Sequence, residues 1–267
     1  MNPEDTAGHP DSSPTPPAEA ERIADYRVSP IGYLATPFTD RFAIPRQPRL
    51  VPHARGRLRL LPAYARPEAV RGLQDFSHVW LQFIFHRSME EWHPTVRPPR
   101  LGGNRRVGVF ASRSPYRPNP LGLSLVELLD VDTRDGVQLL FGGVDLLDGT
   151  PIVDIKPYLP FIESEPTARG AYVDGWPPTL DVEFSPVAEK QLTHACRRWP
   201  ELAELLREVL AQDPRPAYAD DPERLYGCRL HDLEIKWRCR QRRAIVEDVS
   251  PADESREDRE NRPFQCP

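Results

Sequence analysis

Residues Phe76–Phe85 read FSHVWLQFIF and combine the aromatic and β-branched side chains that favour β-strands. Their nearly continuous apolar character predicts a strand that is buried on both faces. Shorter apolar runs, separated by turn residues, surround this segment between residues 26 and 160. We expect further strands at Val28–Leu34, Gly56–Leu61, Val107–Ala111, Leu121–Val131, Val137–Phe141 and Ile152–Ile155, and one short helix at Pro67–Leu73. Many short strands at close spacing predict a mainly β fold, either a barrel or a sandwich.

The sequence pattern changes after a linker at Glu163–Pro178. Thr179–Phe184 alternates as a strand does, and Ser185 followed by a proline is a typical helix start. We expect helices from Ser185 towards Arg198 and from Pro200 to Gln212, and then a hairpin of Tyr226–Arg238 and Ala244–Val249. The chain is thus divided into a disordered, acidic, proline-rich tail (1–27), a β domain (28–172), a small α+β domain (173–249) and a second disordered tail (250–267).

The net charge of −5 conceals an uneven distribution of charge along the chain. Residues 1–25 and 247–267 carry net charges of −5 and −4, so the remaining residues sum to +4. Residues 41–122 alone hold fifteen arginines, no lysine and four acidic residues, a balance of +11. A basic region of this size is the electrostatic signature of a polyanionic partner such as a nucleic acid.

The segment Arg97–Ser124, RPPRLGGNRRVGVFASRSPYRPNPLGLS, is rich in arginine, proline and glycine and contains no acidic residue. Proline restricts the backbone and glycine frees it, so this composition predicts a shaped loop system around a short strand. Arginine side chains held in such a frame present forked donors suited to phosphate, carboxylate or base edges. A loop that is merely solvated would not need this rigidity, and we therefore interpret the segment as a binding surface.

Several classes of protein are disfavoured by what the sequence lacks. No apolar run approaches the ~20 residues of a membrane span, and the N-terminus does not have the pattern of a signal peptide. The four cysteines are scattered without metal-ligand spacing, which predicts reduced thiols and no metal site. The sequence contains no glycine-rich dinucleotide fingerprint, P-loop or nucleophile elbow. A cofactor site would therefore be formed by loops at the rim of the β domain.

Many separated motifs resemble, in the same order, those of the TrmO family, also described as TsaA-like or YaeB-like proteins. The matching segments are Thr36–Phe38, Arg41–Phe42, Ile44–Gln47, Gly72–Leu73, Phe76–His78, Phe85–His86, Pro98–Asn104, Gly108–Ala111 with Arg113, Arg117–Pro120, Asp148–Pro151, Asp154–Tyr158, Val209–Tyr218, Leu230–Asp232 and Trp237–Arg238. The resemblance covers residues 28–249 and leaves only the two tails unmatched.

The resemblance implies an S-adenosyl-L-methionine-dependent tRNA methyltransferase, with a TsaA-like β-barrel domain and a small C-terminal α+β domain. The family's reaction methylates N6 of N6-threonylcarbamoyladenosine at position 37, so the implied partner is a tRNA anticodon stem-loop. A cytoplasmic homodimer, with the cofactor pocket near the subunit interface and no membrane contact, is also implied. The cofactor residues carried over by motif are Pro45, Arg46, Gln47, His86, Arg87, Arg113, Leu123, Asp145, Leu146, Leu147, Asp148, Gly149 and Thr150.

Removal of the N6 proton needs a general base, and Asp154 and His86 are the candidates for this catalytic role. Lys156 or an arginine would hold the threonyl carboxylate. The side chains expected to contact tRNA are Arg100, Arg105, Arg106, Arg117, Lys156, Arg215, Arg240, Arg242 and Arg243.

Structural interpretations of the same residues remain open. Asp148-Gly149 is a common turn signal, and Asp154 could simply pair with a nearby cation. His86 could be a core histidine bonded to the backbone at the end of an apolar strand, and Arg215 could only tie down its loop. Two other functions are also open, a non-catalytic tRNA- or nucleotide-binding barrel and a methyltransferase with a different substrate. The intact PRQ, FHR, ASR and LDGT segments, which begin at Pro45, Phe85, Ala111 and Leu147, favour an active enzyme.

Overall fold

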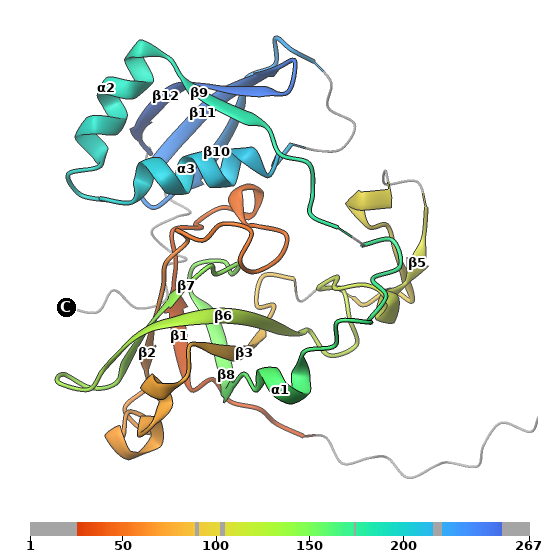
Figure 1. Ribbon diagram of the computed structural model, residues 1–267, viewed down its shortest axis with the longest axis vertical. Coiled ribbons are helices and arrows are strands. Elements are labelled where there is room, and N and C mark those ends of the chain that lie inside the picture. The colour runs from red at the N-terminus through yellow and green to blue at the C-terminus, as the bar shows by residue number, and fades with distance from the viewer. Residues whose placement is uncertain (1–25, 89–90, 102–104, 174, 216–220, 253–267) are drawn as a thin grey trace, which may run out of the picture.

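The computed structural model describes residues 26–88, 91–101, 105–173, 175–215 and 221–252. Its first domain is a closed antiparallel barrel with the strand order β1-β2-β7-β6-β3-β8 (Figure 1). The strands are β1 (Gly32–Ala35), β2 (Gly56–Leu60), β3 (His78–Ile84), β6 (Leu121–Asp132), β7 (Gln138–Gly142) and β8 (Thr150–Pro157). The prediction of a mainly β fold is confirmed, and the fold is a barrel rather than a sandwich.

The central strand β3 is buried on one face only, so the expectation of burial on both faces is wrong. Val79, Leu81 and Phe83 are buried inside the barrel, whereas the alternating Trp80 and Gln82 are half-buried on its outer surface. A barrel strand necessarily directs successive side chains inward and outward. The Trp80 side chain on the outer face is partly covered by the segment that follows β8, since its indole N–H donates to Glu163 at 3.0 Å.

Two predicted elements of the β domain have a different form. Only Val107–Gly108 of the expected Val107–Ala111 strand is extended; as β5 it pairs with β4 (Thr95–Val96) outside the barrel, and the 3-10 helix η5 (Val109–Ala111) follows. A further 3-10 helix, η4, spans Pro99–Leu101. The helix expected at Pro67–Leu73 is two 3-10 helices, η2 (Pro67–Val70) and η3 (Leu73–Asp75). Gly72 separates them because its φ of 83° ends the helical geometry.

The second domain is a four-stranded sheet with the order β10-β11-β12-β9 and two helices. Its elements are β9 (Asp181–Phe184), α2 (Pro186–Ala195), α3 (Leu202–Ala211), β10 (Tyr226–Leu230), β11 (Leu233–Arg240) and β12 (Arg243–Pro251), and the short helix α1 (Pro160–Glu163) precedes them. The predicted cap is confirmed, since the Ser185 hydroxyl accepts from the Ala188 N–H at 3.1 Å. The single strand predicted at Tyr226–Arg238 is wrong, because a turn at His231, with φ 55°, divides it.

The two predicted disordered tails, 1–27 and 250–267, lie almost entirely outside the described residues. At the second one, β12 continues to Pro251, and the Ala252 N–H donates to the Asp232 carbonyl at 2.9 Å. Within the described part of the chain, no helix has the length and apolar character needed to cross a membrane.

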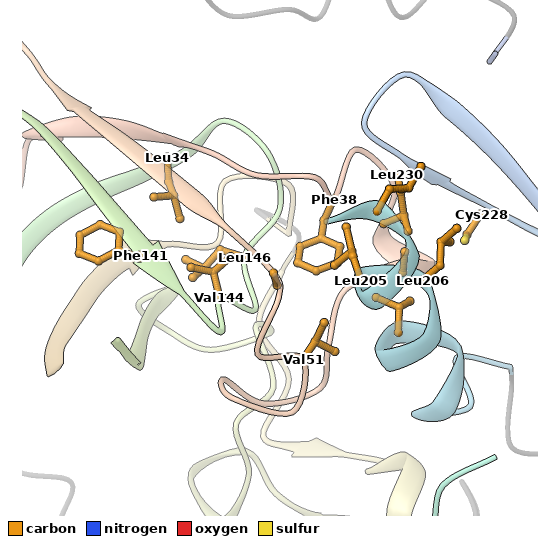
Figure 2. Close-up of a cluster of buried hydrophobic side chains, with 14 of the residues drawn as sticks. Leu34, Phe38, Val51, Phe141, Val144, Leu146, Leu205, Leu206, Cys228 and Leu230 are labelled. Carbon is orange, nitrogen blue, oxygen red and sulfur yellow. The ribbon is translucent and has the colours of Figure 1, made fainter. Parts of the chain in front are cut away.

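A long loop, residues 36–55, lies between the two domains and carries the 3-10 helix η1 (Arg41–Ala43) (Figure 1). Helix α3 faces this loop with a buried stripe at helical spacing, Leu202, Leu205, Leu206, Val209 and Leu210. Figure 2 shows Phe38 between the barrel side chains Val144 and Leu146 and the α3 side chains Leu205 and Leu206. The buried side chains therefore form one hydrophobic core that extends through both domains.

Polar contacts reinforce this junction. The His231 N–H donates to the Pro37 carbonyl at 2.7 Å, and Phe38 forms an isolated β-bridge with Leu230. The His231 ring stacks on Trp199 with 3.8 Å between ring centroids, and burial lowers the pKa of His231 to about 4.

Two glutamates of the C-terminal domain also contact the loop across the junction. Arg55 Nε donates to Glu201 at 2.7 Å, and its Nη2 donates to the other oxygen of the same carboxylate. The backbone N–H of His53 donates to Glu208 at 2.8 Å, and the His53 ring lies 2.6 Å from the same carboxylate. These contacts fix how the C-terminal domain sits on the barrel.

Replacing Phe38 with alanine should destabilise the whole chain, because this fully buried ring connects the two halves of the core. We expect Phe38→Ala to lower the free energy of unfolding by about 3–5 kcal/mol. Urea denaturation followed by fluorescence and circular dichroism measures this change. Val187→Ala is the control: the side chain is 60% exposed, so the change should stay within about 0.5 kcal/mol. Equal effects of the two substitutions would contradict the proposed role of Phe38.

Candidate functional site

One end of the barrel gathers most of the residues predicted for the cofactor. The register places Phe83, near the end of β3, opposite Gly122 of β6 and Ile152 of β8. The residues that follow β3, the first residues of β6 and the turn that precedes β8 therefore share this end of the barrel. β1 also ends here, since Leu34 pairs with Thr150, and it leads into the loop 36–55. Topology thus brings together motifs that are far apart in the sequence.

The Asp145–Thr150 turn is anchored to the residues that follow β1. The Thr36 N–H donates to an Asp148 carboxylate oxygen at 2.9 Å, and the Thr36 hydroxyl donates to the Leu146 carbonyl at 2.9 Å. The Asp148 N–H donates to the Phe38 carbonyl at 2.8 Å, and Gly149 has a φ of 74°. Asp148-Gly149 therefore forms a turn, in agreement with the structural interpretation of these two residues, and hydrogen bonds fix the position of its backbone.

The residues of this turn differ in what they can offer a ligand. The Leu146 side chain is part of the core, and the buried Thr150 hydroxyl donates to the Leu147 carbonyl at 2.6 Å. Asp148 is exposed, and Leu147 and Gly149 are half-buried. The fold itself uses the side chains of Leu146 and Thr150, and the Asp148 carboxylate also accepts from Thr36. A cofactor at this turn would therefore share the carboxylates of Asp145 and Asp148 with contacts inside the chain.

Asp145 belongs to a polar group that connects several motifs at this end. The Ser124 hydroxyl of β6 donates to Asp145 at 2.6 Å. Arg113, whose charge acts on Asp145, donates to the Gln47 side-chain oxygen at 2.6 Å, and Gln47 in turn donates to the Arg46 carbonyl. Burial raises the pKa of Asp145 to about 6, against the opposing effects of the Ser124 hydrogen bond and the Arg113 charge. The site therefore holds a carboxyl group that changes charge near neutral pH.

His86 and Arg87 follow β3 at the same end of the barrel. Burial, together with the positive charge of Arg87, lowers the pKa of His86 below its usual value. The imidazole is thus neutral at physiological pH and able to accept a proton. Arg41 donates to the Arg87 carbonyl, which links this segment to η1, and the predicted cofactor residue Leu123 is 50% exposed on β6.

Asp154, the other candidate base, lies within β8, where it pairs in register with Gln82 on the barrel wall. Its carboxylate accepts from Lys156 at 2.8 Å and from the Ile155 N–H at 2.9 Å. These contacts match the structural interpretation of Asp154 as the partner of a nearby cation. They also engage Lys156, which was expected to hold a carboxylate of the substrate or to contact tRNA.

The arginines predicted to contact tRNA from the β domain have two different environments. Arg105 is exposed, and the exposed Arg106 donates to the Thr95 hydroxyl at 2.9 Å. Arg117 is half-buried, donates to the Ser112 carbonyl at 2.9 Å and lies over the Phe110 ring. Arg117 thus shapes its own loop. Arg100 lies in η4, and its side chain is outside what the structure describes.

The arginines predicted to contact tRNA from the C-terminal domain all have partners within the chain. Arg215 forms a forked pair with Asp213 at 2.7 and 2.9 Å, and its side chain is 15% exposed. The other three partners are the Glu223 carboxylate for Arg240 at 2.8 Å, the Thr179 carbonyl for Arg242 at 2.9 Å and the Glu183 carboxylate for Arg243 at 3.2 Å. Arg215 matches its structural interpretation as a residue that ties down its own loop.

A cavity of about 190 Å³, which the sequence did not predict, lies between the loop 36–55 and the end of α3. Residues 41–46 and Val51 line one side, and Val209, Gln212 and Pro214 line the other. The sequence motif identified Pro45 and Arg46, which belong to one wall of this cavity. The opposite wall comes from the other domain, so no local signal could have shown that the two walls face each other.

The buried carboxyl group of Asp145 should make stability depend on pH. The pKa of about 6 lies above the ordinary value of 3.8, so ionisation of Asp145 destabilises the folded state. We expect Asp145→Asn to raise the free energy of unfolding by about 1–3 kcal/mol at pH 8. This gain should shrink as the pH falls through 6 and vanish near pH 4. Urea titrations at pH 4, 6 and 8 measure it.

The matched control for this prediction is Asp132→Asn. Arg134 lowers the pKa of the half-buried Asp132 to about 2, so loss of this charge should slightly destabilise the protein above pH 4. A stability gain for Asp145→Asn that is the same at all three pH values would contradict the role assigned to burial.

Comparisons with known proteins agree with this arrangement. The family model described as the tRNA-methyltransferase O N-terminal domain matches residues 33–164, and the TrmO C-terminal domain matches residues 177–252. The chain is 51% identical over 221 residues to the tRNA (adenine(37)-N6)-methyltransferase of Escherichia coli K12, an alignment that covers 81% of this chain and 94% of that protein. Identity to the protein of the same name from Eikenella corrodens is 49% over 176 residues, 66% of this chain and 97% of that protein.

A solved structure shares the fold. The crystal structure of TrmO from Pseudomonas aeruginosa superimposes with a TM-score of 0.74 at 41% sequence identity, covering 85% of this chain and 99% of that one. Both domains of the chain match the corresponding family models, and the relatives are matched over nearly their full length. The chain therefore belongs to the TrmO family.

Proposed function

We propose that this protein is an S-adenosyl-L-methionine-dependent methyltransferase that acts on N6 of adenine 37 in tRNA, with N6-threonylcarbamoyladenosine as the form of the base that is modified. The observation that carries the proposal is that 51% identity extends over 94% of a relative named tRNA (adenine(37)-N6)-methyltransferase. The assembly of the PRQ, FHR, ASR and LDGT segments around one end of the barrel supports it.

The residues at this end fit the proposed cofactor. Gly149 has no side chain, so a ligand can approach its backbone closely. The carboxylates of Asp145 and Asp148 can accept hydrogen bonds from ribose hydroxyls or from an adenine amino group. Arg113 and Gln47, joined at 2.6 Å, add a polar pair, and the Arg113 charge acts on Asp145. When bound, S-adenosyl-L-methionine supplies a methyl group on a positively charged sulfur, so the protein needs no nucleophile of its own.

The chain's own residues would then align the target nitrogen and take up its proton. That nitrogen lies between a purine and a carbamoyl group, which makes its proton easier to remove than that of a simple amine. His86 is the better placed of the two candidate bases, because it belongs to the FHR segment at the end of the barrel that gathers the other cofactor motifs and burial keeps its imidazole unprotonated. Asp154 already accepts from Lys156 and from the Ile155 backbone.

We also propose that the protein is located in the cytoplasm and forms a homodimer. Support for association comes from large apolar side chains exposed along residues 110–123. Phe110 is 76% exposed, Leu121 45% and Leu123 50%. Large exposed apolar side chains that lie near one another in the chain fit an interaction surface. The involvement of Leu123 would place such a surface next to the proposed cofactor pocket.

The function is tested by incubating the purified protein with S-adenosyl-L-methionine and tRNA, followed by mass spectrometry of the nucleosides. We expect a methyl group on N6-threonylcarbamoyladenosine. Arg113→Ala should lower kcat/KM about tenfold or more through weaker cofactor binding, which calorimetry measures directly. Arg134→Ala is the control, since that side chain is 88% exposed in the β6–β7 turn at the other end of the barrel. A wild-type protein that binds no S-adenosyl-L-methionine would exclude the enzymatic function and leave a tRNA-binding barrel.

The tRNA footprint is tested by the salt dependence of binding. Arg105 and Arg106 are exposed and have no acidic partner among the described residues, whereas Arg240 and Arg243 are paired with glutamates. We expect the double alanine variant of Arg105 and Arg106 to reduce the slope of log K against log salt by about one unit for each phosphate that is no longer neutralised. The double alanine variant of Arg240 and Arg243 should change the slope less. A larger change of slope for the Arg240 and Arg243 variant would instead place the tRNA contacts on the C-terminal hairpin.

A further inference from the structure

Three buried hydroxyl groups hold one turn of the barrel domain. The buried side chains of the described residues are otherwise apolar or aromatic, and the exceptions are Thr36, Ser124 and Thr150. Thr36 and Thr150 donate to backbone carbonyls of the Asp145–Thr150 turn at 2.9 and 2.6 Å, and Ser124 donates to the Asp145 carboxylate at 2.6 Å. A hydroxyl group inside a hydrophobic core is costly unless it is hydrogen-bonded. All three of these groups therefore serve the turn that is proposed to bind the cofactor.

Ser124 differs from the two threonines because its partner is a charged side chain. It lies in β6, pairs in register with Leu81 of β3 and is 2% exposed. Asp145 itself is half-buried and thus less enclosed than Ser124. An ionised carboxylate offers about four acceptor positions, so a single serine leaves others for a ligand. Ser124 can therefore act on Asp145 from inside the barrel without blocking it.

The surroundings of Asp145 determine whether its carboxyl group is charged. Burial raises the pKa of Asp145 to about 6, and the Ser124 hydrogen bond and the Arg113 charge oppose this rise. Among the described residues, Arg113 is the charged side chain that acts on Asp145, since the other carboxylate of the turn, Asp148, accepts from the Thr36 N–H. Removal of the Ser124 hydroxyl would leave burial opposed mainly by Arg113. The carboxyl group would then ionise only at a higher pH.

We propose that Ser124 is a positioning residue for the cofactor, because its hydroxyl keeps Asp145 ionised and so able to accept hydrogen bonds from the ribose hydroxyls or the adenine amino group of S-adenosyl-L-methionine. Ser124 acts through Asp145 and touches no ligand itself. This inference rests on the proposed function and deepens it, since it assigns a role in cofactor binding to a residue outside the cofactor motifs and makes that binding depend on pH.

The test is the affinity for S-adenosyl-L-methionine, measured by calorimetry between pH 5.5 and 8. The carboxylate form binds, so wild-type affinity should be full above pH 6 and fall as the pH decreases through 6. We expect Ser124→Ala to move this midpoint upward by about one pH unit. Its affinity should therefore be about threefold weaker than wild type at pH 6.5 and within twofold of wild type at pH 8. Ser124→Thr keeps the hydroxyl and should keep the wild-type midpoint.

The matched control is Ser250→Ala in β12, because the Ser250 hydroxyl donates to the Asp248 carboxylate at 2.7 Å in the other domain. This variant loses the same kind of hydrogen bond and should leave cofactor affinity unchanged at every pH.

A second measurement needs no cofactor. The Asp145 carboxyl carbon is followed by NMR in protein labelled with carbon-13 at the aspartate carboxyl groups, and Asp145→Asn identifies its signal. We expect the titration midpoint of this signal to move upward in Ser124→Ala and not in Ser250→Ala. In the Asp145→Asn protein, the further change Ser124→Ala should alter cofactor affinity less than twofold, because the group through which Ser124 acts is no longer charged.

Two results would overturn the role of Ser124. One is an affinity that depends on pH in Ser124→Ala as it does in the wild type, even if the NMR titration moves. The other is an affinity that is weaker by the same factor at every pH, which would indicate a purely structural role. Failure of the proposed function has a different signature: the wild-type protein binds S-adenosyl-L-methionine with the expected pH profile but transfers no methyl group to tRNA. A wild-type protein that binds no cofactor at any pH would overturn both.

Discussion

The backbone of Thr36–Phe38 is hydrogen-bonded on two sides, and the rest of the structure depends on this arrangement. On one side Thr36 and Phe38 hold the Asp148 turn. On the other side Pro37 accepts from His231, and Phe38 bridges to Leu230 of the C-terminal sheet. Three residues after β1 thereby determine both where the proposed cofactor turn lies and how the second domain is docked. Since the Phe38 ring is fully buried between the domains, the polar and apolar parts of this junction reinforce each other.

The local features of the sequence could be predicted, and those set by tertiary contacts could not. Barrel strands and the Ser185 cap follow from side-chain alternation and from a serine–proline pair. The break at His231 could not be predicted, because a non-glycine residue rarely adopts a φ of 55°. The conformation accompanies a tertiary contact, in which the His231 N–H donates to the Pro37 carbonyl. The segment after Gly108 is similar: its apolar residues suggest a strand, but they form a 3-10 turn outside the barrel.

The candidate site shows the same division. Motifs identified its individual residues, but their partners come from distant positions. Ser124 and Asp145 are 21 residues apart, and Gln47 and Arg113 are 66 apart. The distribution of free positive charge is also hidden in the sequence, because a sequence gives the number of arginines and not their pairing. Arg55 is neutralised by Glu201 of the other domain, whereas Arg46 has no such partner among the described residues and faces the interdomain cavity.

The continuous core between the barrel and the C-terminal domain has a consequence for how RNA can be engaged. Domains that share buried side chains such as Phe38, Leu146 and Leu206 cannot open and close like a hinge without exposing that surface to water. Two domains held in one arrangement require a bound nucleotide to adapt to them. Under the proposed function, the target base would have to leave its stack and swing out of the anticodon loop to reach the barrel. Most of the conformational cost of the reaction is then borne by the RNA and not by the protein, and loops that are already loosely stacked become the easiest to modify.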